Sequence, residues 1–221
     1  MIEIVKVENK DQEKEFVMFP FSLYKGCDYW VPPIISEELE SMDKEKNPVF
    51  ENAEAEFYIA KKDGVTVGRI AAMVNWVEIE EQKKNKLRFG WYDTIDDLEV
   101  SKKLLESVIE FGKKRKLEFV DGPVGFSNMD KAGLLIEGYE ELNTMITWYH
   151  YPYQKEHLKK LGFSKLAEWV EYKIKIFSAE DAPEKVKKFS KIIQQRYELK
   201  VLNFKSRKEI IPYVDKMFEL L

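Results

Sequence analysis

The stretch LRFGWYDTIDDLEVSKKLLESVIEFGKKRKLEFVDGP, residues 87–123, constrains the fold more than any other part of the chain. Leu87, Phe89 and Trp91 alternate with polar or small residues, which predicts a half-buried strand. Apolar residues at positions 104–109 then recur at helical spacing, and an extended run resumes before the Asp-Gly-Pro end. This order predicts a strand–helix–strand unit, which normally forms a parallel pair of strands with a right-handed crossover.

Charged residues mark both ends of the predicted helix. Asp96, Asp97 and Glu99 open it, and a basic run at residues 113–116 closes it. Each sign lies at the end where the helix dipole favours it. The acidic turn is therefore expected at the N-terminus of a helix that directly follows the central strand.

The N-terminal part predicts a strand followed by helices. A strand is expected at residues 2–7, and Asp11 is expected to cap a helix that Pro20 ends or kinks. An aromatic, proline-bearing loop with a short helix at residues 36–42 comes next.

A hairpin is predicted before the central strand. Lys62-Asp63-Gly64 joins two apolar runs at residues 57–60 and 65–73, and Asp-Gly between such runs is a strong hairpin signal. Residues 75–86 are expected to form a polar connection to the central strand.

The part after Pro123 is expected to complete a first domain, residues 1–177. Its glycines and polar residues predict a long structured loop, with a short strand at residues 144–149. A helix stopped by Gly162 is expected at residues 154–161, and alternation over residues 170–176 predicts a closing strand.

A second unit is expected over residues 183–221. Pro183 stands where a first helical residue would, and a helix (184–199), a strand (200–204) and a helix from Ser206, with Glu209 completing a capping box, are predicted after it. Because the last helix stays apolar to its final residue, either the rest of a second domain is absent or this tail packs on the first domain.

Composition excludes several classes of function. The 36 basic and 40 acidic residues give a formal charge of −4, which is not the electrostatic footprint of a nucleic-acid-binding protein. One cysteine and two histidines make an internal disulfide impossible and a metal site improbable. No run approaches the ~20 apolar residues of a membrane span, and the N-terminus lacks the form of a signal peptide. A cytoplasmic protein is the expectation.

The order of predicted elements over residues 1–177 resembles the GNAT superfamily of acyl-CoA-dependent N-acyltransferases. Residues 47–72 and 122–139 are similar to a group of bacterial GNAT-like proteins in which a second, similar half follows the first. The resemblance implies a mixed α/β sheet flanked by helices, coenzyme A or an acyl-CoA as cofactor, and a small-molecule substrate. It also implies a partner, either a second GNAT-like half or a second copy in a homodimer.

The turn after the central strand departs from the superfamily pattern, Arg/Gln-x-x-Gly-x-Gly/Ala, which lets bare backbone amides approach the pyrophosphate of coenzyme A. Alignment places Asp96, Glu99 and Ser101 at the three motif positions. Trp91, Tyr92 and Ser101 are the candidate cofactor-binding residues that the resemblance implies. The acids either cap the helix and nothing more, or belong to an altered cofactor loop; in both cases they count against coenzyme A binding in the usual way.

A second signature is also missing, because Leu158 replaces the tyrosine that protonates the departing thiolate in the superfamily. The aromatic cluster at residues 148–153 is the best substitute. His150 is expected to titrate near neutrality, and Tyr149 or Tyr151 could donate a proton. The alternative is a structural histidine among packing aromatic residues.

Other candidates are weaker. Glu137 is either a catalytic base or a brace of its loop, and Asn128 and Asp130 in the same loop are candidate substrate-binding residues. Trp30 either lines a substrate pocket or packs on the core. His157, next to lysines, is expected to be solvated.

Two functions follow from these observations. The first is transfer of an acyl group from an acyl thioester to an amine, at an altered site around His150 or in a missing second half. The second is a non-catalytic ligand-binding or interaction module on the same scaffold, since both chemical signatures are absent.

Overall fold

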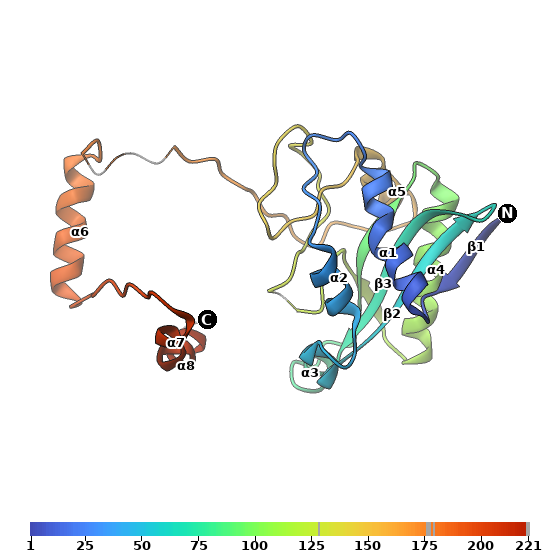
Figure 1. The fold of residues 1–221 in the computed structure, drawn as a ribbon, viewed down its shortest axis with the longest axis horizontal. Coiled ribbons are helices and arrows are strands. Elements are labelled where there is room, and N and C mark those ends of the chain that lie inside the picture. Colours follow the sequence, from blue (N-terminus) through green and yellow to red (C-terminus); the bar gives the residue numbers. More distant parts are fainter. Residues whose placement is uncertain (128, 176–177, 179, 220–221) are drawn as a thin grey trace. The chain divides into compact units, whose positions relative to one another are not determined.

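The computed structural model describes residues 1–127, 129–175, 178 and 180–219 (Figure 1). The chain divides into two compact units, Met1–Val170 and Glu171–Leu221, and each is described by itself below.

The first unit is built on one five-stranded sheet with the order β1-β2-β3-β4-β5. The strands are β1 (Ile2–Lys6), β2 (Ala53–Lys62), β3 (Val65–Asn75), β4 (Lys86–Thr94) and β5 (Phe119–Asp121). The first four run antiparallel to their neighbours, whereas β4 and β5 are parallel. The predicted mixed α/β sheet flanked by helices is therefore confirmed.

The predicted hairpin is confirmed as the β2–β3 pair. Lys62 and Val65 face each other across a turn in which Asp63 and Gly64 both have positive φ, 52° and 83°. Two successive residues of positive φ give the turn whose twist matches that of the strands, and Asp-Gly tolerates this backbone well. Both strands extend beyond the predicted ranges because their flanks also pair.

Two helices cover one face of the sheet (Figure 1). They are α1 (Lys10–Leu23) and α2 (Ile35–Met42), followed by a short 3-10 helix, η1 (Pro48–Glu51). Their apolar side chains, including Phe16 and Met42, form a core with β2, β3 and Phe126. Asn9 rather than Asp11 caps α1, since its side chain accepts from the Gln12 amide at 3.0 Å. Pro20 does not end the helix, which continues to Leu23.

The other face is covered by α4 (Leu98–Lys114), the predicted crossover helix between β4 and β5. Its buried positions, Val100, Leu104, Leu105, Val108 and Phe111, recur at helical spacing and join the larger core cluster. Gly112 lets the helix lie close to β4, because a Cβ there would come within 2.8 Å of the Leu87 side chain.

Two shorter helices complete the first unit, and one of them was not expected. Residues 75–86 contain α3 (Trp76–Glu80), which Asn75 caps by accepting from the Val77 amide at 3.0 Å. The predicted helix after the aromatic cluster is confirmed as α5 (Pro152–Lys160).

Two predicted strands of this region are wrong. Residues 144–149 form no strand but contain a turn at residues 144–147, in which the Thr147 amide donates to the Thr144 carbonyl. Residues 170–175 are not in a strand either. The sheet ends at β5, which has three residues and is followed by Pro123, a residue without an N–H, so it offers little edge for another strand.

The second unit is helical in its described residues. It contains α6 (Glu184–Arg196), α7 (Arg207–Ile210), the 3-10 helix η2 (Ile211–Tyr213) and α8 (Val214–Phe218). Ser206 stands at the N-cap position of α7, but its side chain makes no capping hydrogen bond and instead donates to the Glu209 carboxylate at 3.1 Å. The strand predicted at residues 200–204 is wrong. Among the described residues of either unit, no helix has the length and apolar character needed to cross a bilayer.

Candidate functional site

The candidate site lies where β4 loses its parallel neighbour. The chain after β5 stays beside β4 as far as Val124, whose amide donates to the Phe89 carbonyl at 2.8 Å. Contact is so close there that a Cβ on Gly90 would meet the Val124 carbonyl at 2.5 Å. Beyond that point the Tyr92 carbonyl is bonded at 3.2 Å by the side chain of Gln154, from α5, instead of by a strand.

Three antiparallel strand pairs are followed by one parallel pair, whose crossover is α4. This is the mixed sheet flanked by helices that the sequence resemblance implied. The fold is GNAT-like. In this GNAT-like unit, α5 provides the hydrogen bond to β4 beyond the point of contact with Val124, through the side chain of Gln154.

A bulge in β4 marks the same point. Arg69 faces Asp93 across the β3–β4 ladder, but Ala71 faces Gly90, so β4 has one extra residue in this interval. Trp91 takes a φ of +48°, a conformation that is uncommon for a bulky residue and costs on the order of 1–3 kcal/mol. Bulges of this kind recur beside active sites because they redirect side chains.

The bulge directs Asp93 into a buried polar cluster, here called the Asp93 centre. Its members come from five elements: Tyr24, Arg69, Asp93, His150 and Gln154. The Asp93 carboxylate accepts from Arg69 Nε at 2.7 Å and from the Tyr24 hydroxyl at 2.6 Å. Gln154 Oε1 lies 3.4 Å from the same hydroxyl. Ionisable groups buried together in this way are typical of functional sites, although structural ion pairs also occur.

Two charged residues in apolar strands are the sequence signal for this centre. Arg69 is a lone charge in the apolar run of β3, and Asp93 ends the apolar run of β4. A charge in such a position needs a partner. The pairing itself could not be predicted, because it depends on the bulge that sets the β3–β4 register.

His150 is buried beside this centre and differs from the expectation of a group that titrates near neutrality. Burial lowers its pKa to about 4, and the nearby Asp93 carboxylate opposes this effect only in part. Its Nδ1 atom accepts from the Leu135 amide at 3.4 Å. His150 is therefore a neutral hydrogen-bonding group at neutral pH.

The buried imidazole should make the stability of the unit depend on pH. Between pH 6.5 and about 4 the unfolded chain binds a proton at His150 and the folded chain does not, so this contribution is complete above pH 6.5 and is lost as the pH falls. The pKa difference corresponds to ~3 kcal/mol. Urea unfolding at pH 7 and pH 4.5 should show this slope in wild type and a reduced slope in His150→Gln; equal slopes would contradict it.

Aromatic side chains surround Tyr24 on the outer side of the centre. Trp30 stacks on it with ring centroids 5.3 Å apart, and Tyr149 and Tyr151 approach it at 5.5 and 5.1 Å. Burial is the main cause that raises the pKa of Tyr149 and of Tyr151, and Cys27 contributes to both. The structure thus brings together four predicted site residues: Trp30, Tyr149, His150 and Tyr151.

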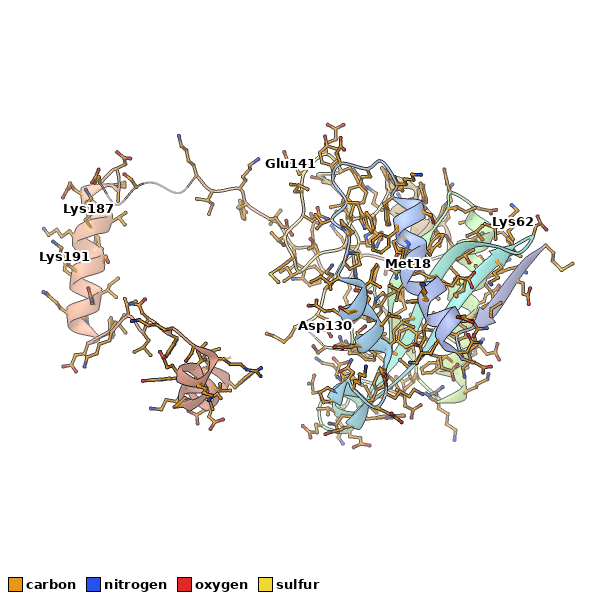
Figure 2. The ribbon with its side chains drawn as sticks, viewed as in Figure 1. Met18, Lys62, Asp130, Glu141, Lys187 and Lys191 are labelled. Carbon is orange, nitrogen blue, oxygen red and sulfur yellow. The ribbon has the colours of Figure 1, made fainter. Side chains whose placement is uncertain are left out.

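Other predicted site residues lie elsewhere. Glu137 is exposed, and Asp130 braces its loop by accepting from the Ser127 amide at 2.8 Å. Figure 2 shows Asp130 and Glu141, two residues of this long loop, well apart from each other. Asn128 lies outside the described residues.

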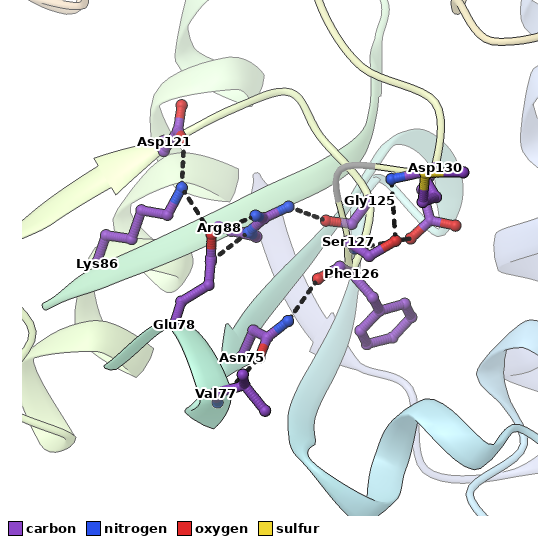
Figure 3. A network of polar contacts seen from close by, with 11 residues as sticks. Asn75, Val77, Glu78, Lys86, Arg88, Asp121, Gly125, Phe126, Ser127 and Asp130 are labelled. Atoms are coloured by element: carbon purple, nitrogen blue, oxygen red, sulfur yellow. Dashed lines mark hydrogen bonds and ion pairs between the residues drawn. The ribbon is translucent and has the colours of Figure 1, made fainter. Parts of the chain in front are cut away.

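A buried ion network fixes the start of that loop (Figure 3). Arg88 of β4 binds Glu78 of α3 through two hydrogen bonds, at 2.6 and 2.8 Å, and donates a third to the Gly125 carbonyl at 3.1 Å. Asn75 donates to the Phe126 carbonyl at 3.2 Å. Lys86 lies between Glu78 and Asp121, at 3.3 and 2.9 Å. The loop that leads to the aromatic residues is thereby tied to the sheet.

The three residues predicted to bind a cofactor are divided between the two faces of β4. Trp91 lies on the α2 side, where its Nε1 donates to Glu38 at 2.7 Å. The Tyr92 hydroxyl donates to Ser101 Oγ at 2.9 Å on the α4 side.

His157 was expected to be solvated, and that expectation is wrong. Its ring is buried between α4 and α5, with Nδ1 2.8 Å from Ser101 Oγ and Nε2 3.2 Å from Asp96 Oδ1. Because Tyr92 donates to Ser101, the Ser101 hydroxyl is free to donate to Nδ1, and Nε2–H then points at Asp96. The lysines beside His157 in sequence lie on other sides of α5, which the local sequence did not reveal.

The acidic turn forms the N-terminus of α4, as predicted. The Asp97 side chain is its cap and accepts from the Glu99 amide at 3.1 Å. The other carboxylate oxygen pairs with Lys62 Nζ at 3.0 Å. These contacts, with the Lys62 hydrogen bond first, lower the pKa of Asp97, so the cap is an anion at neutral pH.

No protein-family model matches the chain. It is 32% identical over 167 residues to Protein YghO of Escherichia coli, a match that covers 74% of this chain and 43% of that protein. It is 23% identical over 174 residues to Bacterial ceramide synthase of Caulobacter vibrioides, covering 78% and 45%. The chain thus spans less than half the length of these curated relatives. A predicted acetyltransferase from Clostridium acetobutylicum, solved with acetyl-CoA, matches with 14% identity and a TM-score of 0.47, covering 78% of this chain and 96% of that one.

Proposed function

We propose that this GNAT-like unit takes part in acyl transfer from an acyl thioester to an amine. The observation that carries the proposal is the Asp93 centre at the bulge in β4. At this point β4 still pairs with β3 but has no strand on its other side among the described residues. Strained backbone and buried ionisable groups cluster at functional sites more than elsewhere. Similarity to a protein named Bacterial ceramide synthase adds support, because a ceramide contains an acyl group joined to an amine through an amide bond.

The reaction has simple requirements. The amine nitrogen attacks the thioester carbonyl carbon, the C–S bond breaks, and the departing thiolate takes up a proton while the amine loses one. Burial raises the pKa values of Tyr149 and Tyr151, so both hydroxyls carry a proton at neutral pH. In this proposal one of them passes that proton to the departing thiolate. In this proposal they replace the superfamily tyrosine, whose position Leu158 occupies as a buried core residue.

The Asp93 centre positions these groups. Its hydrogen bonds fix Tyr24, on which Trp30, Tyr149 and Tyr151 pack. The neutral His150 is buried near Asp93 and Arg69 and accepts from the Leu135 amide, which ties the loop before the aromatic residues to this position. Glu137, Asp130 and Asn128 remain candidates for contact with the substrate.

The expected cofactor, coenzyme A or an acyl-CoA, fits this site only in part. The N-terminus of α4 carries an ionised Asp97 with the carboxylates of Asp96 and Glu99 beside it, and does not fit a diphosphate. We therefore propose an acyl thioester as the donor. The nucleotide part of coenzyme A has no assigned role in this unit.

Replacement of Tyr151 by phenylalanine tests the proton-donor role. We expect Tyr151→Phe to lower kcat by roughly 10²-fold with little change in KM, because the lost hydroxyl acts in the transition state. Amide formation from acyl thioesters and a panel of amines would be followed by mass spectrometry. Tyr58→Phe, on the α4 side of the sheet, is the matched control. Unchanged turnover in both Tyr151→Phe and Tyr149→Phe would remove these residues from the mechanism.

A second candidate is a non-catalytic ligand-binding or interaction module, which the capped N-terminus of α4 favours. Amide formation that depends on Tyr149 or Tyr151 would exclude it. Failure of the chain to form an amide from any thioester, together with saturable binding of an amine, would support it instead. The proposal for the whole protein also retains a second GNAT-like half or a homodimer as the partner of this unit.

A further inference from the structure

The N-terminus of α4 already holds an anion that belongs to the chain. Asp97 Oδ1 accepts from the Glu99 amide, and the Asp97 carbonyl accepts from the amides of Val100 and Ser101 at 3.1 and 3.3 Å. The second carboxylate oxygen is bonded to Lys62. The amides that make a helix N-terminus attractive to phosphate are thus engaged within the molecule.

The neighbouring carboxylate is also fixed in place. Asp96 is hydrogen bonded to His157, and His157 is hydrogen bonded to Ser101, whose hydroxyl meets Tyr92 and Thr94 as well. This chain of hydrogen bonds joins the start of α4 to α5. It holds the Asp96 carboxylate at the mouth of the turn, and it places a buried side chain where the superfamily has a bare glycine.

The charge balance of the turn opposes a diphosphate. Lys62 is engaged by Asp97, and Lys102 lies 3.8 Å from Glu99. The side chain of Asp96 is 69% exposed and that of Glu99 is 52% exposed. An approaching ligand would therefore meet both negative charges. Like charges at such short range disfavour binding even in a partly solvated site.

We propose that this chain recognises an acyl thioester without its nucleotide, because Asp97 is a built-in substitute for the diphosphate at the α4 N-terminus. The inference rests on the proposed function. It limits the part of the donor that this chain recognises to the acyl chain and the thioester arm. The residues that depart from the superfamily pattern are those of the acidic turn, Asp96 to Ser101, together with His157 of α5.

Two donors with the same acyl group separate this inference from the proposed function. An acyl-CoA and the corresponding acyl-N-acetylcysteamine thioester, which has no nucleotide, should give kcat/KM values that agree within about threefold. A preference for the acyl-CoA of tenfold or more in wild type would overturn the inference and leave acyl transfer intact. Failure of both donors to react would instead contradict the proposed function.

Binding can be measured whether or not turnover occurs. Coenzyme A added to the wild-type chain should leave the amide resonances of Glu99, Val100 and Ser101 unshifted in NMR spectra, and saturable shifts there would contradict the inference. The double variant Asp96→Gln, Asp97→Ser removes two carboxylates and keeps a serine cap for the helix. It should gain saturable shifts at the same amides, whereas Asn9→Ser, a cap exchange at α1, should not. If the double variant unfolds, the wild-type titration still decides.

Discussion

Replacement of Arg88 by methionine is expected to lower the free energy of unfolding of the first unit by about 3–5 kcal/mol. Arg88 is 1% exposed, and it makes two hydrogen bonds to the Glu78 carboxylate and one to the Gly125 carbonyl. In the variant, Glu78, which is 5% exposed, keeps Lys86 at 3.3 Å as its one counter-charge among the described residues. It also frees the loop that this network ties to the sheet.

Urea unfolding at pH 7 would measure this effect. Lys114→Met provides the matched control, since it removes an exposed ion pair with Glu110 on α4, and such pairs contribute at most a few tenths of a kcal/mol. The pKa of Glu78 is lowered in the folded state: burial alone would raise it, but the hydrogen bonds and charges of Arg88 and Lys86 outweigh that effect. A loss similar to that of the control would show that the network adds little to stability.

Removal of the Asp93 charge is expected to have an effect of similar size. Asp93→Asn leaves the Arg69 guanidinium, 4% exposed, without its counter-ion and weakens the bond from Tyr24. We expect a loss of about 3–5 kcal/mol in the free energy of unfolding, because an unpaired buried charge is costly. Thermal and urea unfolding of the variant would provide the value.

A double variant separates the structural contribution of this pair from its functional one. Replacing a buried ion pair by apolar residues of similar volume is often neutral for stability. Arg69→Met with Asp93→Leu should therefore recover most of the stability that Asp93→Asn loses. If the Asp93 centre also serves catalysis, this double variant should form no amide. A stable double variant that retains full turnover would show that the Asp93 centre serves the fold only.

Much of the fold was predictable from local patterns. The change of period between Leu87 and Leu105 identified β4 and α4, and the Asp-Gly turn identified the β2–β3 hairpin. Capping chemistry correctly assigned the acidic turn to the start of α4. These signals are reliable because they depend on residues that are near one another in the sequence.

The candidate site was predictable only in its aromatic part. The aromatic cluster around His150 could be proposed from the sequence, but the contacts of Tyr24, Arg69, Asp93 and Gln154 join segments up to 130 positions apart in the sequence. His157 was misjudged because the charged neighbours in its helix suggested solvent, whereas its own face of α5 meets α4. Burial of a polar residue is decided by such long-range packing.

The incorrect strands have a related cause. Residues 170–176 alternate as a strand would, but a strand also needs a receptive edge, and β5 offers only three residues. Alternation indicates which segments could join a sheet. It does not indicate whether a neighbour is present.

The bulge at Trp91 shifts the phase of the central strand. Leu87 and Phe89 face α4, as alternation predicts, but Trp91 faces α2 and Tyr92 takes its place against α4. If the same residues alternated regularly through this point, with no bulge, every side chain of β4 after Gly90 would lie on the opposite side. Asp93 would then point into the apolar core under α4, and Tyr92 and Thr94 would leave Ser101. The bulge therefore decides which face of the sheet carries the Asp93 charge, and the Asp93 centre and the contacts of Ser101 with Tyr92 and Thr94 both depend on it.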